Sequence, residues 1–334
     1  LSTSSLGTSN FRAGVNAGNS ITAGGNFNTV VGDEAGTANT TGDKNVAVGF
    51  EALKANTTAG NNTAVGYNAL LANTEGFSNT AFGSRAGDAI TTGDANTALG
   101  NLALSAETTG ARSVAIGNGA LSNQNSTDSA DMYNVAVGAD AGAQVTTGIR
   151  NSILGGLAGD ALTDADFNVA MGYQALSTDT LGSRSVAIGY NALVTQNFTS
   201  ATNSLNVAVG YSSGAAVTTG TNNTFVGNES GSTVTTGAGN TFIGGLAGDA
   251  TDDGANNTAV GYLALSANCG DQNTALGRSA LQAVTGQQNT AMGYGAGSGV
   301  TTGSNNIIIG RAADGASGAS HQITIGDNLS LIHI

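Results

Sequence analysis

Small, polar and aliphatic residues alternate in one short pattern that returns along the whole chain. The stretch Asn61–Leu70 reads NNTAVGYNAL, and variants such as NTAFGSRAG, NVAVGADAG and NTAMGYGAG follow it. Counted from the glycine that closes each copy, Asn stands four residues earlier in 16 of 19 copies. An aliphatic residue or Phe stands one residue earlier in 18 of them. A tract such as NTAVG predicts a short β-strand that ends in a glycine turn.

The closing glycines recur at a spacing that indicates a solenoid. Nineteen of them run from Gly14 to Gly326, and twelve of the eighteen intervals are 17 residues long. A period this short predicts stacked coils instead of a series of globular domains. We therefore predict an all-β fold, a parallel β-solenoid or β-roll of about 19 coils of mostly 17 residues. At about 4.8 Å per coil the rod would be roughly 85–90 Å long.

The repeat also divides the chain. We expect a lead-in over residues 1–9, one solenoid repeat domain over residues 10–328, and a non-repeat tail over residues 329–334. Three residues after the closing glycine every earlier copy has Ala or Ser, but the last copy has Leu329, the first residue of the tail LSLIHI. The six residues resemble a translated transposon end used in sequencing libraries. We expect them to be foreign, and the native chain to continue; the missing initial Met likewise indicates a fragment or processed product.

The asparagine column predicts a structural ladder. Stacked coils bring identical positions into register, so that Asn amides pass hydrogen bonds from one coil to the next. The predicted ladder consists of Asn28, Asn45, Asn62, Asn79, Asn96, Asn134, Asn151, Asn168, Asn206, Asn223, Asn240, Asn257, Asn273, Asn289 and Asn306. Ser113, Ser185 and Gln322 are the exceptions in this column.

Two further positions vary together. Four residues after the glycine the chain has mostly Leu or Gly; after Leu the residue three places on is usually polar, as in Leu70 and Asn73. After Gly it is usually aliphatic, as in Gly87 and Ile90. This exchange predicts that two side-chain placements fill the same interior space, with the packed volume of each coil held constant.

The strands are apolar on both faces, which predicts self-association. We expect the aliphatic residue before the glycine to point inward and the residue before it, mostly Ala, to point outward; with the parity reversed, the larger aliphatics face outward. A strand apolar on both faces is normally covered on both. Such a ribbon exceeds the apolar patch that a soluble monomer usually exposes. The predicted oligomer face consists of Ala47, Ala64, Ala81, Ala98, Ala115, Ala136, Ala170, Ala187 and Ala208.

Composition excludes several function classes. The net charge is −13, which repels nucleic acid and anionic lipid. Nothing reaches 18 consecutive apolar residues, so we expect no membrane insertion in this fragment. Cys269 is the single cysteine and is expected to be buried, with no disulfide within the chain.

No catalytic constellation is visible, so we predict a non-enzyme without cofactor or metal. The glycine-rich tract GGLAGDA, at 155–161 and 244–250, lacks the Gly-Lys-Ser/Thr of a phosphate loop. Two acidic clusters leave calcium open as a minor alternative to solvated turns: Asp160, Asp164 and Asp166, and Asp249, Asp252 and Asp253. A partial Tyr column leaves glycan contact open as a minor alternative to packing at the coil edge: Tyr67, Tyr173, Tyr190, Tyr211, Tyr262 and Tyr294.

The tracts SVAIGNGA (Ser113–Ala120) and SVAIGYNA (Ser185–Ala192) resemble the head repeats of YadA-like trimeric autotransporter adhesins. The form at Asn56–Leu70 is also similar to repeats of phage tail fibres and bacterial surface proteins. The resemblance implies a left-handed parallel β-roll, a homotrimer and an extracellular position on a cell surface or virion. The period is longer here than in the usual head repeat, and no stalk, membrane anchor or chaperone domain is visible.

We therefore expect a structural and binding rod, the shaft or head of a surface adhesin or phage tail fibre. Its partners would be other copies of itself and a host-surface receptor or glycan, with no nucleic acid. The two 21-residue intervals predict receptor-contacting loops around Asn123–Asp131 and Gln196–Asn203. The alternative is an ice-binding solenoid that uses a flat threonine-rich face. The row in question is Thr29, Thr63, Thr80, Thr97, Thr224, Thr241, Thr258, Thr274 and Thr290, with Val at several positions between them.

Overall fold

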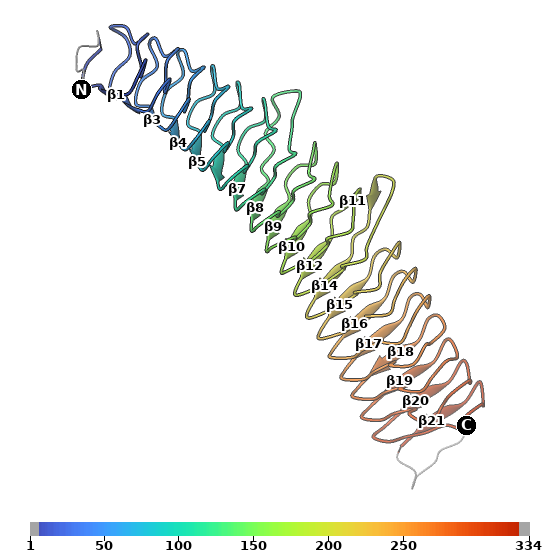
Figure 1. Cartoon of the computed structure of the whole chain (residues 1–334). Helices are drawn as coiled ribbons and strands as arrows, with labels where there is room; N and C mark the ends of the chain where they lie inside the picture. The colour runs from blue at the N-terminus through green and yellow to red at the C-terminus, as the bar shows by residue number, and fades with distance from the viewer. Residues whose placement is uncertain (1–6, 327–334) are drawn as a thin grey trace. The chain divides into compact units, whose positions relative to one another are not determined.

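The computed structural model describes residues 7–326, and within that range it contains short β-strands, turns and no helix. Contacts divide the chain into two compact units, Leu1–Phe167 (unit 1) and Asn168–Ile334 (unit 2). In each unit the strands are stacked side by side along one face of the coils (Figure 1). The predicted fold class is confirmed: an all-β parallel β-solenoid of about 19 coils about 17 residues apart. The left-handed sense stays a prediction, and residues 329–334 lie outside the described residues.

Nearly every strand has three residues and occupies the tract before a closing glycine. Unit 1 holds β1 (Phe11–Ala13), β2 (Thr29–Val31), β3 (Val46–Val48), β4 (Thr63–Val65), β5 (Thr80–Phe82), β6 (Thr97–Leu99), β7 (Val114–Ile116), β8 (Val135–Val137) and β9 (Ser152–Leu154). Unit 2 holds β10 (Val169–Met171), β11 (Gly182–Ser183), β12 (Val186–Ile188), β13 (Thr202–Asn203), β14 (Val207–Val209), β15 (Thr224–Val226), β16 (Thr241–Ile243), β17 (Thr258–Val260), β18 (Thr274–Leu276), β19 (Thr290–Met292), β20 (Ile307–Ile309) and β21 (Ile323–Ile325).

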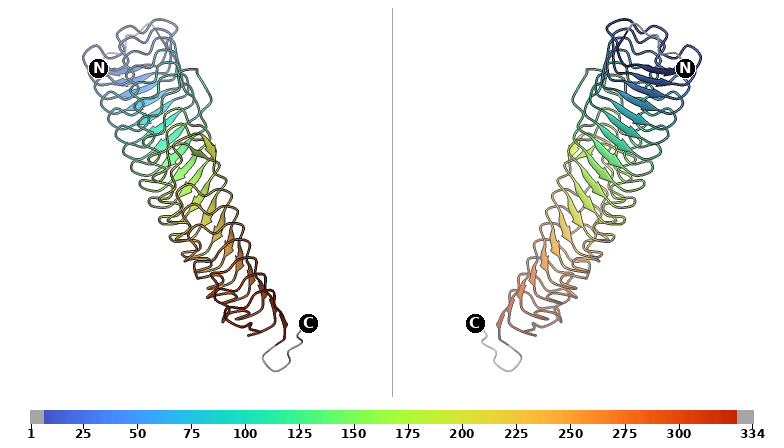
Figure 2. Two further views of the ribbon diagram at one scale, coloured as in Figure 1. Left: turned by 90° about the vertical axis from the view of Figure 1, so that its right-hand side faces the viewer. Right: turned by 90° about the vertical axis from the view of Figure 1, so that its left-hand side faces the viewer.

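Within each unit the strands pair in parallel with the same position of the next coil. Thr63 pairs with Thr80 in unit 1, and Thr224 pairs with Thr241 in unit 2. The connecting turns close each coil before the next strand begins, as the side views show (Figure 2). In unit 2, β11 and β13 belong to successive coils and pair with each other outside the main sheet. Figure 1 shows β11 on the side of the coils away from the main-sheet strands.

The closing glycine is required by both backbone conformation and space. Gly66, for example, has φ of +140°, a conformation that residues with a side chain rarely adopt. A Cβ on Gly66 would also overlap the carbonyl oxygen of Gly83 in the next coil. The glycine therefore allows adjacent coils to approach at strand spacing just where the chain leaves the sheet.

The interior of each coil is narrow. From β2 on, the second residue of each main-sheet strand is buried, and so is the Ala or Ser three residues after the closing glycine; Ala64 and Ala69 are both fully buried. Where the residue four places after the closing glycine is Gly in place of Leu, side chains from other positions fill the space. Ile90 Cδ1 and Leu70 Cδ2 lie 3.0 and 3.1 Å from where a Cβ of Gly87 would stand. The exchange of two side-chain placements predicted from the sequence therefore matches the observed packing.

The asparagine column connects the coils through their backbones. The backbone N–H of Asn62 donates to Oδ1 of Asn45 at 2.9 Å, and Nδ2 of Asn62 donates to the carbonyl of Gly76 at 2.8 Å. Oδ1 of Asn62 accepts from the backbone N–H of Asn79 at 2.9 Å. All the ladder residues named from the sequence are buried. Each amide oxygen thus supplies a hydrogen-bond acceptor for the backbone of the next coil. Bonds between the side chains themselves are secondary; one example joins Asn289 Nδ2 to Asn273 Oδ1 at 3.1 Å.

We expect Asn62→Ala to destabilise unit 1 by about 1–3 kcal/mol, because the buried N–H of Asn79 loses its acceptor. Asn101→Ala is the control, since Asn101 is exposed and its bonds are long, 3.2 and 3.3 Å; it should stay within about 0.5 kcal/mol. Urea unfolding measures both, and hydrogen exchange of the Asn79 N–H gives the local effect. Equal losses in the two variants would show that the ladder does not stabilise the stack.

Candidate functional site

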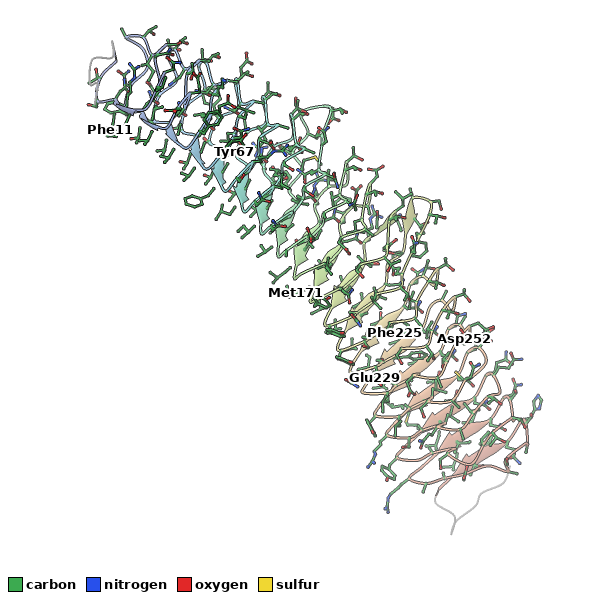
Figure 3. All side chains as sticks on the ribbon, viewed as in Figure 1. Phe11, Tyr67, Met171, Phe225, Glu229 and Asp252 are labelled. Carbon is green, nitrogen blue, oxygen red and sulfur yellow. The ribbon has the colours of Figure 1, made fainter. Side chains whose placement is uncertain are left out.

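The most extensive candidate surface is the outward side of the main-sheet strands. In β5 the first and third residues, Thr80 and Phe82, are exposed on either side of buried Ala81. Figure 3 shows Met171, a third residue, pointing away from the coil, while Phe225, a second residue, lies inside it. We call the first and third strand residues together the outer strand face. In-register pairing turns each position into a column.

The third-residue columns are almost entirely apolar. In unit 1 the column is Ala13, Val31, Val48, Val65, Phe82, Leu99, Ile116, Val137 and Leu154. In unit 2 it is Met171, Ile188, Val209, Val226, Ile243, Val260, Leu276, Met292, Ile309 and Ile325. The side chains of Phe82 and Met292 are 58% and 48% exposed. In unit 1, Phe82, Leu99 and Leu154 are exposed and the other large members are half-buried, so apolar groups lie partly open along one face of each unit.

The predicted oligomer face is wrong in its orientation. Its nine alanines are at most 1% exposed and lie inside the coils: Ala47, Ala64, Ala81, Ala98, Ala115, Ala136, Ala170, Ala187 and Ala208. Ladder Asn and strand Ala stand two residues apart and so share one side of the strand. Because the Asn is buried, the Ala is buried with it. The aliphatic residues expected inside are the ones that face outward.

The predicted threonine row lies on this same surface. Its nine threonines are first residues of their strands, as Thr63 is in β4 and Thr258 is in β17. An apolar third residue stands two places after each of them, on the same side; it is aliphatic or Met except at Phe82. The outer strand face thus combines hydroxyl-bearing and aliphatic columns, with Val in place of Thr at positions such as Val46 and Val207.

The aromatic column beside the closing glycines forms stacks. In unit 2 the ring centroids of Tyr173 and Tyr190 are 5.8 Å apart, and those of Tyr190 and Tyr211 are 5.3 Å apart. The Arg278 guanidinium lies between Tyr262 and Tyr294, 5.6 and 5.7 Å from their centroids. A sugar packs on the open face of an aromatic ring, and here the faces turn toward neighbouring coils. This arrangement favours packing at the coil edge over glycan contact.

In unit 1 a buried carboxylate holds the base of the first projecting loop. Oε1 of Glu107 accepts from the backbone N–H groups of Gly110 at 2.7 Å and Ser126 at 3.1 Å. Oε2 accepts from Nε2 of Gln124 at 2.8 Å. Glu107 and Gln124 are fully buried. The carboxylate therefore supplies acceptors for backbone that leaves the regular repeat.

Gln124 also compensates for the ladder position at which Ser113 replaces Asn. Oε1 of Gln124 accepts from Nδ2 of Asn134 at 2.9 Å, so its amide takes over part of the missing ladder contact. Sequence reasoning recorded Ser113 as an exception but missed this compensation. The signal was present, because Gln124 and Gln196 stand at the same position in the two long intervals.

Unit 2 repeats the arrangement with an aspartate, Asp179, in the place that Glu107 has in unit 1. Oδ2 of Asp179 accepts from Nε2 of Gln196 at 2.6 Å, and Oδ1 accepts from the N–H of Phe198 at 3.0 Å. Oε1 of Gln196 accepts from Nδ2 of Asn206 at 2.8 Å. The residues at the loop tips stay exposed, as Thr199, Ser200 and Ala201 are in this loop. Two equivalent loops are thus fixed at their bases and open at their tips.

Beside the first loop lies an acidic cavity of about 270 Å³, lined in part by Asp128, Asp164 and Asp166. Their carboxylates already accept bonds: Asp164 from Oγ1 of Thr147 at 2.7 Å and Asp166 from the N–H of Ile149 at 2.8 Å. Within residues 7–326, no three or more His, Cys, Asp or Glu side chains are grouped so that they could hold a metal ion. Asp164 and Asp166 thus form hydrogen bonds with the neighbouring coil.

The acidic turns of the two GGLAGDA tracts behave alike. Burial raises the pKa of Asp160, with a smaller contribution from the charge of Asp140. Burial likewise raises the pKa of Asp249, with a contribution from Glu229. Oδ1 of each carboxylate is buried without a hydrogen-bond partner. In the second cluster Asp252 Oδ1 accepts from Oγ1 of Thr235 at 2.6 Å.

Cys269 is buried, as expected, and contacts the hydroxyl of Thr251 at 3.3 Å. Burial raises the pKa of the Cys269 thiol, which keeps it protonated and unreactive at neutral pH. In the described part of the chain no helix is long and apolar enough to cross a membrane. No protein-family model matches this chain, and no curated protein sequence matches it.

We expect Asp249→Asn to raise the midpoint of thermal unfolding at pH 7. The raised pKa means that the native state binds the proton more tightly than the unfolded chain, so stability falls as pH rises above the ordinary value of 3.8. The neutral amide of the Asp249→Asn variant does not ionise, so this loss of stability is absent. Below pH 3.8 the carboxyl is protonated in both states, and the gain should disappear. Exposed Asp253→Asn is the matched control; calorimetry that gives equal shifts for both variants at both pH values would refute the assignment.

Proposed function

We propose that this chain is a structural and binding rod, the shaft or head of a surface adhesin or phage tail fibre. The resemblance of its repeats to adhesin heads supports this proposal, and the β-solenoid fold is compatible with it. The observation that carries it is the outer strand face. Parallel sheets are normally covered on both sides, and here no element within residues 7–326 covers the outer side of the main-sheet strands.

The energy available from covering that face is of the same order as the cost of association. Fully burying a large aliphatic side chain contributes about 1.5–3 kcal/mol, so a half-exposed one gains on the order of 1 kcal/mol. Of the eight large third residues in unit 1, only Phe82, Leu99 and Leu154 are exposed and the other five are half-buried. Complete burial therefore contributes on the order of 5 kcal/mol for that unit. Unit 2 adds a similar amount. Association costs about 4–15 kcal/mol, so the contribution of the two columns, on the order of 10 kcal/mol together, is of the same size as this cost.

In the proposed assembly the copies meet through their third-residue columns, and three copies is the number that the resemblance implies. The polar turns and the two projecting loops then face outward, where a host-surface receptor or glycan is available. The exposed tips are Thr127, Asp128 and Ser129 in the first loop and Thr199, Ser200 and Ala201 in the second. The proposed location is extracellular, with no catalysis, no cofactor and no nucleic-acid partner.

A second candidate, ice binding, is favoured by one specific observation. In the neighbouring strands β15, β16 and β17, Thr side chains stand beside aliphatic ones on the outer strand face, and each recurs at the spacing of adjacent strands, about 4.8 Å. A regular hydroxyl and methyl array of this kind suits a lattice of ordered water. This function needs the face open to solvent, so it excludes the assembly proposed above.

We expect Phe82→Glu combined with Leu99→Glu to separate the subunits, because two charges would be buried at the shared face. Light scattering on the unmodified chain at micromolar concentration should give a multiple of the single-chain mass. Phe77→Glu is the matched control, since Phe77 is an exposed Phe of the same coil away from the strand. By contrast, Ala98→Glu should unfold its coil, because Ala98 is buried. A single-chain mass for the unmodified protein would contradict the proposed assembly.

We expect no thermal hysteresis from the unmodified chain, since the assembly covers the threonine column. The measurement is the gap between melting and freezing points in the presence of a seed crystal. Thr80→Tyr serves as the variant, because it changes the exposed array without entering the interior. Hysteresis in the unmodified protein that disappears in this variant would replace the rod with the ice-binding function.

A further inference from the structure

Three tyrosines of unit 2 form an uninterrupted stack on the coil edge. Tyr190 lies between Tyr173 and Tyr211, with interplanar angles of 16° and 7° to its neighbours. All three side chains are about half exposed, between 45% and 52%. The register of the solenoid holds them in line, so each phenol has another phenol beside it and both remain open to a reagent in solution.

We propose that Tyr190 is a site of oxidative cross-linking, joined to Tyr173 or Tyr211 as dityrosine within one chain. A one-electron oxidant, such as an oxidised peroxidase haem or a photo-oxidised metal complex, takes one electron from each of two phenols, and each phenol releases its hydroxyl proton. The two phenoxyl radicals join through a carbon–carbon bond between ring positions next to the hydroxyls. Those two carbons then lose their hydrogens as protons to the oxygens, which restores both phenols. The product has two hydrogen atoms fewer than the pair.

The remaining aromatic positions of the column provide built-in comparisons. Tyr67 stacks on Phe50, which has no phenol to oxidise, at 5.6 Å. Tyr262 and Tyr294 are separated by Arg278, which lies over both rings. Only in the stack around Tyr190 does one phenol lie directly against another among the ring pairs of the described residues. The geometry therefore selects one site from six column tyrosines.

A cross-link at this place would act as a staple between coils. The chain has one cysteine and cannot form a disulfide within itself. A bond from Tyr190 to Tyr211 closes the coil that carries β13, and a bond to Tyr173 closes the coil before it. Covalent closure of a loop stabilises the native state by reducing the freedom of the unfolded chain. The site thus offers covalent reinforcement that the sequence otherwise lacks.

The test exposes the purified full-length chain, at low concentration, to a brief flash with a ruthenium tris-bipyridyl complex and persulfate. We expect dityrosine fluorescence, the loss of two hydrogen masses from the intact single chain, and cross-linked peptides that contain Tyr190 with Tyr173 or Tyr211. Tyr190→Phe keeps the ring stack and should lose the signal. Tyr262→Phe is the matched control and should keep it. The cross-linked chain should also unfold at higher temperature than the untreated one.

Several outcomes would overturn the proposal. Unchanged fluorescence in Tyr190→Phe, or cross-linked peptides that join Tyr262 to Tyr294, would show that the stack does not direct the reaction. Cross-links between chains in place of those within a chain, seen as higher bands on a denaturing gel, would show that neighbouring coils are not the reacting partners. Absence of dityrosine under conditions that oxidise free tyrosine would also refute it. The single-chain mass, the identity of the cross-linked peptides and the response to Tyr190→Phe do not depend on the proposed assembly.

Discussion

The hydrogen bond that the side chain of a ladder asparagine accepts from the backbone N–H of the next coil is the constraint on which the other features depend. Oδ1 of Asn62 accepts the N–H of Asn79, while its Nδ2 satisfies the carbonyl of Gly76. A side chain that binds backbone on two sides permits one register only, because a slip by one residue would turn the amide outward and leave these groups unpaired. Fixed register is what makes every other position a column.

Once the asparagine is buried, the alternation of the strand decides what faces out. The second strand residue must share the interior with it, and the opposite wall is close, so this position is small in most coils. The larger aliphatics are therefore displaced to the outside. Where a bulky second residue does occur, as at Phe225 and Phe242, glycines leave space for it. A Cβ on Gly214 would collide with the ring of Phe225, and a Cβ on Gly248 would collide with the ring of Phe242. The apolar outer strand face is thus a consequence of a narrow interior.

The sequence was sufficient for the period, the solenoid class, the asparagine ladder and the exchange between Leu and Gly positions, since each is a statement about spacing. The orientation of the strand was predicted wrongly, because hydrophobicity was used to decide which residue points inward. The polar ladder was the better guide: Asn79 and Ala81 stand two residues apart, and a ladder needs burial. The link from Glu107 to Gln124 escaped prediction because it joins residues from different coils through a turn whose path the repeat does not fix.

A chain built this way carries its surface chemistry in columns instead of in a cluster of unlike residues. Any residue type that recurs at one position becomes a stripe, and a single exception interrupts it, as Arg278 does between Tyr262 and Tyr294. This is consistent with the absence, within residues 7–326, of three or more His, Cys, Asp or Glu side chains placed to hold a metal ion: neighbours along a column are alike, and bringing unlike groups together requires a departure from the repeat. The two 21-residue intervals are the largest such departures, and each needs a buried carboxylate to satisfy its backbone. Under the proposed function, binding specificity comes either from the extended outer strand face or from these two loops.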